Sequence, residues 1–113
     1  MGEKELDRLK LNSINYNTSL ALNWLVKSGI QNNNKNRKSQ FGAFNAWYDI
    51  KSKKYSYMYS EITGYLITSM IFHYRLTKKK IYLSSAKKAA DWLIKNAQHK
   101  NGGFKCLFLI NKN

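Results

Sequence analysis

The chain has 113 residues with no proline and one cysteine, and 43% of its residues are hydrophobic. This length suits one small domain, and the apolar content excludes a disordered tail. Lys and Arg outnumber Asp and Glu by 20 to 6, for a formal charge of +14, which favours an anionic partner such as nucleic acid, an acidic lipid surface or an anionic polysaccharide. A compositional bias towards lysine, asparagine and isoleucine explains the charge equally well, so both interpretations stay open.

The first segment, residues 1–16, begins with MGEKELDRLK, which alternates charges where a secretory signal would have an apolar centre. No uninterrupted apolar run approaches the ~20 residues of a membrane-spanning helix. Cys106 is the only cysteine, which excludes an intrachain disulfide and a cysteine-based zinc site. His73 and His99 have no second ligand at metal-binding spacing. We therefore expect a cytoplasmic protein that has no membrane segment, metal or other cofactor.

Two parts of the chain are similar to each other. The pattern Trp-Leu-(Val/Ile)-Lys occurs at 24–27 and at 92–95, and each occurrence is followed by a glutamine and then by a turn of two small residues and a phenylalanine. We interpret the segments of about 17–44 and 84–104 as copies of one repeat. Apolar residues at intervals of three and four predict an amphipathic helix in each copy, the second capped by Ser84 or Ser85.

The segment between the two copies predicts a third helix. Residues 60–77 are apolar almost all round a helical wheel, which indicates a buried helix, and a polar loop at 32–40 lengthens the first copy. Amphipathic and buried helices that alternate in this way are typical of helical-hairpin arrays. The repeat region is then 17–105, and 106–113 is a truncated tail.

The stretch YSEITGY at 59–65 and the turn QHKNGGF at 98–104 carry a resemblance to a known family. They resemble the (α/α)6-toroid proteins, the six-hairpin glycosidase-like and squalene-cyclase-repeat superfamily, and in particular poorly characterised polysaccharide-associated proteins with the motif Tyr-Pro-Glu-Thr-Thr-Gly-Tyr. Ser60 replaces the proline of that motif, and Ile62 replaces its first threonine. The resemblance implies an all-α fold made of the helical hairpins of an incomplete toroid, as an N-terminal fragment.

The resemblance also implies candidate site residues. Glycosidases use two carboxylates that flank the scissile bond. Asp49 lies within the aromatic segment 44–59, and Glu61 follows its end. We take these two residues as candidate catalytic groups. Glu61 has a second interpretation as a first-turn carboxylate that complements the helix dipole, worth about 0.3–1 kcal/mol. The apolar face of a sugar packs on aromatic rings, so the candidate ligand-binding residues are Trp47, Tyr48, Tyr57 and Tyr59.

We therefore expect a carbohydrate-associated protein that binds, or formerly processed, an oligosaccharide or acidic glycan and lacks a complete catalytic site. Any activity would be of the glycoside hydrolase, lyase or sugar epimerase type. The alternative is a basic helical module that binds single-stranded nucleic acid or another anionic polymer, since six cations interleave with the aromatic residues: Lys35, Arg37, Lys38, Lys51, Lys53 and Lys54. An incomplete ring also predicts self-association.

Overall fold

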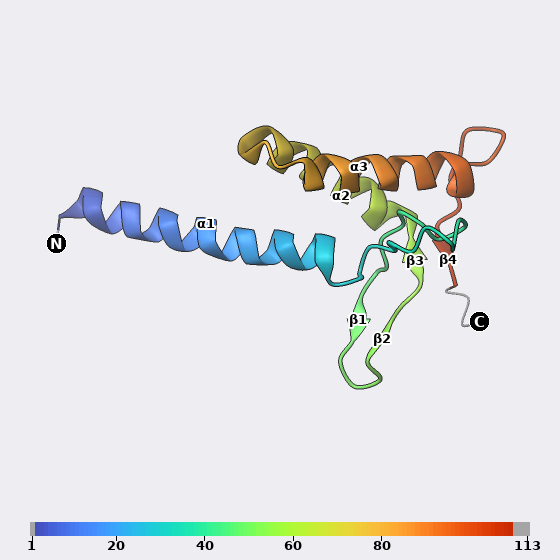
Figure 1. Ribbon diagram of the computed structural model, residues 1–113, viewed down its shortest axis with the longest axis horizontal. Coiled ribbons are helices and arrows are strands. Elements are labelled where there is room, and N and C mark those ends of the chain that lie inside the picture. Colours follow the sequence, from blue (N-terminus) through green and yellow to red (C-terminus); the bar gives the residue numbers. More distant parts are fainter. Residues whose placement is uncertain (1, 110–113) are drawn as a thin grey trace.

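The computed structural model describes residues 2–109, and the side chains of all of these except Leu11 and Ile14. A long helix projects from a body in which two further helices lie side by side (Figure 1). The predicted tail 106–113 falls partly outside the described residues. The elements in chain order are α1 (Glu3–Lys27), β1 (Tyr48–Asp49), β2 (Lys54–Tyr55), β3 (Met58–Tyr59), α2 (Ser60–Thr77), α3 (Lys80–Trp92), a π-helical turn (Leu93–Ala97) and β4 (Leu107–Phe108).

The protein has a small mixed α/β fold, so the prediction of an all-α, incomplete toroid is wrong. Strands β1 and β2 form an antiparallel hairpin in which Tyr48 pairs with Tyr55. Strands β3 and β4 form a second antiparallel sheet, in which Met58 pairs with Phe108. The physical reason lies in residues 55–59, where tyrosines recur at alternate positions, and in the aromatic residues 47 and 48 that pair with this segment. Such residues fit a pleated, half-buried surface, whereas the prediction treated this segment as a loop.

The predicted repeat is also wrong, because matched residues lie in opposite environments. The side chain of Trp24 is 48% exposed, whereas that of Trp92 is 1% exposed. Phe44 is fully buried, and its counterpart Phe104 is 50% exposed. Both copies do close their turns with the same isolated antiparallel bridge between glutamine and phenylalanine. The similarity of the two segments is thus confined to a local turn and does not extend to packing.

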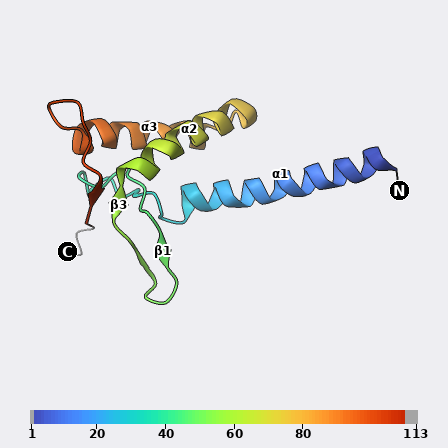
Figure 2. The same cartoon turned by 180° about the vertical axis from the view of Figure 1, so that it is seen from behind.

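Helix α1 joins residues 3–16 of the predicted charged segment and the first predicted helix into one continuous element. Every described side chain from residue 2 to residue 17 is exposed. Only the carboxyl-terminal end of α1 packs on the body, through Leu22 and Val26. Seen from behind, the helix again runs away from the other elements (Figure 2). Among the described helices, none combines the length and the apolarity that a bilayer crossing requires.

The main hydrophobic core lies between α2, α3 and the end of α1. Its buried members are Leu22, Val26, Ile30, Phe44, Met70, Tyr82, Ala86 and Ala89. Helix α2, which the pattern predicted to be covered all round, is covered on one side only, and Tyr65, Phe72 and Leu76 are exposed. Lys78 ends α2 in the left-handed conformation and donates its backbone N–H to the carbonyl of Tyr74.

A buried loop, residues 42–45, is fixed between the two helices of the body. Gly42 lies in this loop with φ of +99°, and a Cβ atom at this position would be 2.1 Å from the carbonyl oxygen of Lys88 in α3. On the other side, the backbone N–H of Phe44 donates to Thr63 Oγ1 in α2 at 3.0 Å. The loop can approach α3 this closely only because residue 42 has no side chain.

We predict that Gly42→Ala lowers the free energy of unfolding by about 3 kcal/mol or more, because the added methyl group meets the backbone of α3 and the φ value is unfavourable. Gly102→Ala is the matched control, since Gly102 has φ of +94° and no neighbouring atom within 4 Å of the place that a Cβ would occupy. In that variant the free energy of unfolding falls by only about 1–2 kcal/mol, because the sole cost is backbone strain. Urea denaturation measures both losses, and equal values would show that the contact with α3 is not close.

The side chain of Gln31 connects this loop to α3. Its amide nitrogen donates to the carbonyls of Gly42 and of Ser85, at 3.0 Å each. Its amide oxygen accepts the Ser85 hydroxyl at 2.7 Å. Ser85, predicted as a helix cap, thus lies inside α3, which begins earlier at Lys80. Buried amides stabilise a fold only when they are fully paired, and Gln31 meets this condition.

We predict that Gln31→Ala lowers the free energy of unfolding by about 2–4 kcal/mol, since it leaves buried partners unpaired and opens a cavity. Gln98→Ala is the control, because Gln98 occupies the equivalent sequence position but is exposed. The Gln98→Ala variant is expected to lower the free energy of unfolding by about 0.5 kcal/mol or less. Chemical denaturation with a common m-value is the measurement. A similar loss in both variants contradicts the anchoring role of Gln31.

Candidate functional site

The β1–β2 hairpin and the strand after it gather three of the four predicted ligand-binding aromatic residues. The rings of Trp47 and Tyr57 lie edge to face with centroids 5.1 Å apart, and those of Tyr57 and Tyr59 do so at 5.7 Å. We call Trp47, Tyr57 and Tyr59 the aromatic row. Trp47 is 54% exposed, so part of its ring is open to a ligand. Edge-to-face pairs of this kind also stabilise the hairpin.

Tyr48, the fourth candidate, belongs to a different aromatic pair. Its ring packs against that of Tyr55 with centroids 5.0 Å apart. The Tyr55 hydroxyl in turn donates to the backbone carbonyl of Ser28, just after α1 ends. The pair therefore joins the hairpin to the end of α1, and its outer member is exposed.

Glu61 lies in the first turn of α2, at the end of the aromatic row. Its Oε2 atom accepts the Tyr59 hydroxyl at 2.8 Å. This hydrogen bond, and then the negative charge of Glu61, raise the pKa of Tyr59 to about 12. Glu61 also lines a cavity of about 470 Å³ between α2 and residues 104–106. The carboxylate is thus exposed at a cavity rim and is oriented by a tyrosine.

Asp49 is the second residue of β1 and immediately precedes the turn of the hairpin. Its carboxylate accepts the Ser52 hydroxyl at 2.7 Å and the Lys51 backbone N–H at 3.0 Å. These bonds, the one from Ser52 above all, hold the pKa of Asp49 below its usual value. The arrangement is that of an aspartate that closes a turn.

The structure does not bring Asp49 and Glu61 together. Asp49 pairs with Lys54, and the five steps along the chain from Lys54 to Tyr59 span about 16 Å if they are extended. The hairpin also points away from α2 (Figure 1). The two carboxyl groups of a glycosidase lie about 5–9.5 Å apart. The geometry therefore does not support the two as a catalytic pair.

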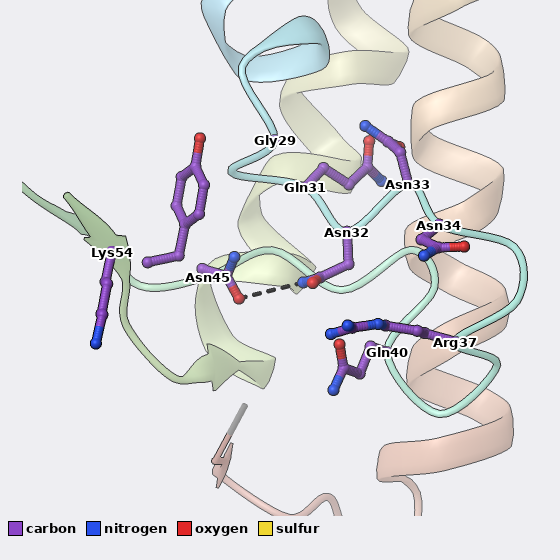
Figure 3. A pocket seen from close by; sticks show the side chains of 10 residues that line it. Gly29, Gln31, Asn32, Asn33, Asn34, Arg37, Gln40, Asn45 and Lys54 are labelled. Carbon is purple, nitrogen blue, oxygen red and sulfur yellow. Dashed lines mark hydrogen bonds between the residues drawn. The ribbon is translucent and has the colours of Figure 1, made fainter. Parts of the chain in front are cut away.

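A cavity of about 640 Å³ lies beside the hairpin and was not singled out from the sequence (Figure 3). This volume is in the range of small-molecule sites. Its signals in the sequence were the asparagines after Gln31, which were interpreted as an inserted polar loop, and Arg37 and Lys54, which were predicted as part of the alternative basic surface. The lining residues are Gly29, Gln31, Asn32, Asn33, Asn34, Arg37, Gln40, Asn45, Lys54 and Tyr55.

The amide groups of this cavity present mainly donors. Asn32 donates to the Asn45 side-chain oxygen at 3.1 Å, which fixes both residues (Figure 3). The side-chain oxygen of Asn33 accepts the ammonium of Lys88, and that of Asn34 accepts the backbone N–H of Asn36. Within the described part of the chain, the amide nitrogens of Asn33 and Asn34 donate to no residue. Their N–H groups are therefore available to a ligand with acceptor oxygens.

The charge around the cavity is positive. Arg37 and Lys54 line it, and no Asp or Glu is among the described residues that do so. Partial burial, and in second place the like charge of Lys35, hold the pKa of Lys88 below its usual value. The ammonium groups of Lys88 and Lys35 are thus close enough to interact. Positive charge next to a cavity whose described lining has no acid favours an anionic ligand.

Comparison with protein-family models, with curated proteins and with solved structures found no match to this chain. The relation to polysaccharide-associated proteins therefore stays a prediction from the YSEITGY stretch. Among the described residues, no three His, Cys, Asp or Glu side chains form a group that could hold a metal ion. The candidate site therefore rests on its own geometry, namely the donor-rich cavity and the aromatic residues of the hairpin.

We predict that Glu61→Gln lowers the pKa of Tyr59 from about 12 towards its ordinary value of 10.0, because it removes the charge and weakens the hydrogen bond. The raised pKa means that Tyr59 contributes fully to stability below pH 10 and that this contribution is lost as the pH rises through about 12. Tyrosinate absorbance is the measurement, and the difference between each protein and its Tyr59→Phe counterpart isolates this residue. An unchanged titration in Glu61→Gln would contradict the contact.

Proposed function

We propose that the protein binds an acidic oligosaccharide, a glycan with carboxylate or sulfate groups, in the cavity of about 640 Å³ beside the hairpin. The observation that carries this proposal is the lining of the cavity. It combines several side-chain amides with Arg37 and Lys54 and contains no described acid. A ligand that matches it has many hydroxyl groups and a net negative charge.

Each part of such a ligand has a partner of suitable chemistry. The amide nitrogens of Asn33 and Asn34 can donate to sugar hydroxyl oxygens. Arg37 and Lys54 can bind carboxylate or sulfate groups, and hydrogen bonds of this charged kind are about twice as strong as neutral ones. The ring of Tyr55 forms an apolar wall, and Tyr48 supports it from outside. The cavity thus has the mixture of apolar wall and few polar groups that small-molecule sites use.

The aromatic row offers a second contact on the same hairpin. The exposed ring of Trp47 can pack against the apolar face of a further sugar unit. At the other end of the row, the paired Tyr59 hydroxyl and Glu61 carboxylate can bind a sugar hydroxyl. Because Asp49 serves the hairpin turn, we propose binding without hydrolysis.

The geometry favours a glycan over single-stranded nucleic acid. The rings of the aromatic row lie edge to face at 76° and 85°, so they do not present parallel open faces to successive bases, which is how single strands are bound. The amide groups of the cavity suit hydroxyl-rich ligands. Nucleic-acid binding is therefore an outcome that a binding experiment must distinguish.

Calorimetric titration with oligogalacturonate tests this proposal, with the uncharged methyl ester and a single-stranded oligonucleotide as competing ligands. We predict that Lys54→Gln and Asn34→Leu each raise the Kd for oligogalacturonate about tenfold, since each removes a hydrogen bond to the ligand. Lys95→Gln removes the same charge from the exposed π-helical turn, and it is expected to leave the Kd within about twofold.

Two results would count against the proposal. Equal weakening in Lys54→Gln and Lys95→Gln would mean that binding reflects the net charge alone. Tighter binding of the oligonucleotide, with a steep dependence on salt, would assign the surface to nucleic acid. Trp47→Ala tests the second contact separately, and an unchanged Kd in a folded variant would remove the aromatic row from the site.

A further inference from the structure

Helix α1 carries an apolar row that no part of the described chain covers. Leu6, Leu9, Tyr16 and Leu20 are 45%, 45%, 65% and 52% exposed. With Ser13 they recur at alternating intervals of three and four residues, at positions 6, 9, 13, 16 and 20. This spacing is that of the a and d positions of a coiled coil. We call these five residues the α1 seam.

The α1 seam lies well away from the side of the helix that packs on the body. Successive residues turn by about 100° around an α-helix, which places the seam roughly opposite Leu22 and Val26, the members of α1 in the core. A partner can therefore lie along the seam without displacing the body. Figures 1 and 2 both show open space around the amino-terminal part of α1.

The amino-terminal part of α1 has little local support beyond its first-turn acids and an exposed ion pair between Glu5 and Arg8 at 3.9 Å. Its N-cap, Gly2, makes no side-chain hydrogen bond, and the described side chains of residues 2–17 are all exposed. The stretch includes four residues with low helix propensity, Asn12, Ser13, Asn15 and Asn17. Unsupported helical segments of this length are marginal in water, so packing along the seam would supply stability that the sequence does not.

We propose that the α1 seam binds the α1 seam of a second copy of this chain, in a parallel and in-register coiled coil. The charges that flank the seam determine the partner and its direction. Glu5 and Lys10 hold the g and e positions on either side of the first seam residues. In a parallel pair each Glu5 faces Lys10 of the other copy, so two intermolecular ion pairs form.

An antiparallel pair offers no such match. Residues 11–26 contain no charged side chain, so an antiparallel overlap of the seams would place Glu5 and Lys10 of each copy against uncharged residues. The same absence of charge along 11–26 suits a helix surface that is partly covered. The occupant with matching spacing and matching charges is thus the same helix in parallel.

Light scattering of the full chain tests the association. We expect the wild type to be a dimer and Leu9→Glu to raise the dimer dissociation constant by at least tenfold, because it places a carboxylate in the seam. The matched control is Asn15→Glu, which adds the same charge at an exposed position outside the seam and leaves the dimer intact. A monomeric wild type, or equal dissociation of the two variants, overturns the proposal. Circular dichroism and the near-ultraviolet signal of the body show that each variant has folded.

Two further variants test the parallel direction. In a Cys106→Ser background, Leu6→Cys is expected to form a disulfide-linked dimer on oxidation, since a parallel register places the two Cys side chains at position 6 together, whereas an antiparallel one separates them. Glu5→Lys and Lys10→Glu are each expected to weaken the dimer, and the double variant to restore it. Failure of the cross-link in a dimeric protein, or failure of the double variant to recover, overturns the parallel arrangement.

Discussion

The fold depends on a loop that runs through the interior. Residues 42–45 are buried, and a buried loop is stable only if its backbone polar groups are paired. The pairing is supplied from both sides. The Phe44 N–H donates to Thr63 in α2, its carbonyl accepts the Tyr59 N–H, and the Gly42 carbonyl accepts Gln31. Because the same loop has α3 against its backbone, it fixes α2 and α3 relative to one another.

This loop also determines where the candidate site lies. The chain leaves it through Asn45, whose N–H donates to the carbonyl of Ile30, and passes directly into the hairpin. The cavity forms between the polar residues that precede the loop and the hairpin that follows it. Its Asn32 and Asn45 side chains meet because the loop returns the chain to its starting point. The lining residues therefore have the polar sequence of a solvated loop, but the core holds them in place.

The sequence predicted local features better than long-range ones. The apolar segment 60–77 located α2 to within a residue, because its length and composition suit a helix. The aromatic residues of the hairpin and Glu61 were selected from their residue types and from the resemblance to toroid proteins. The repeat failed because Trp24 and Trp92 share a motif but not a packing environment. The cavity was missed because Asn34 and Lys54 are brought together only by tertiary structure. The position of Asp49 relative to Glu61 could not be predicted for the same reason, because it depends on the pairing of the hairpin.

The π-helical turn Leu93–Ala97 has a consequence for how this chain can vary. A π turn holds one residue more than the α turn it replaces, so it is the structural equivalent of a single-residue insertion. Removing one residue there would restore an α-helical turn, and because the wide turn already absorbs the extra residue, the segment after it would keep its direction. That segment includes β4, where Phe108 packs on Trp92 and pairs with Met58. The turn is therefore a place where the chain can lose one residue while β4 stays against the body.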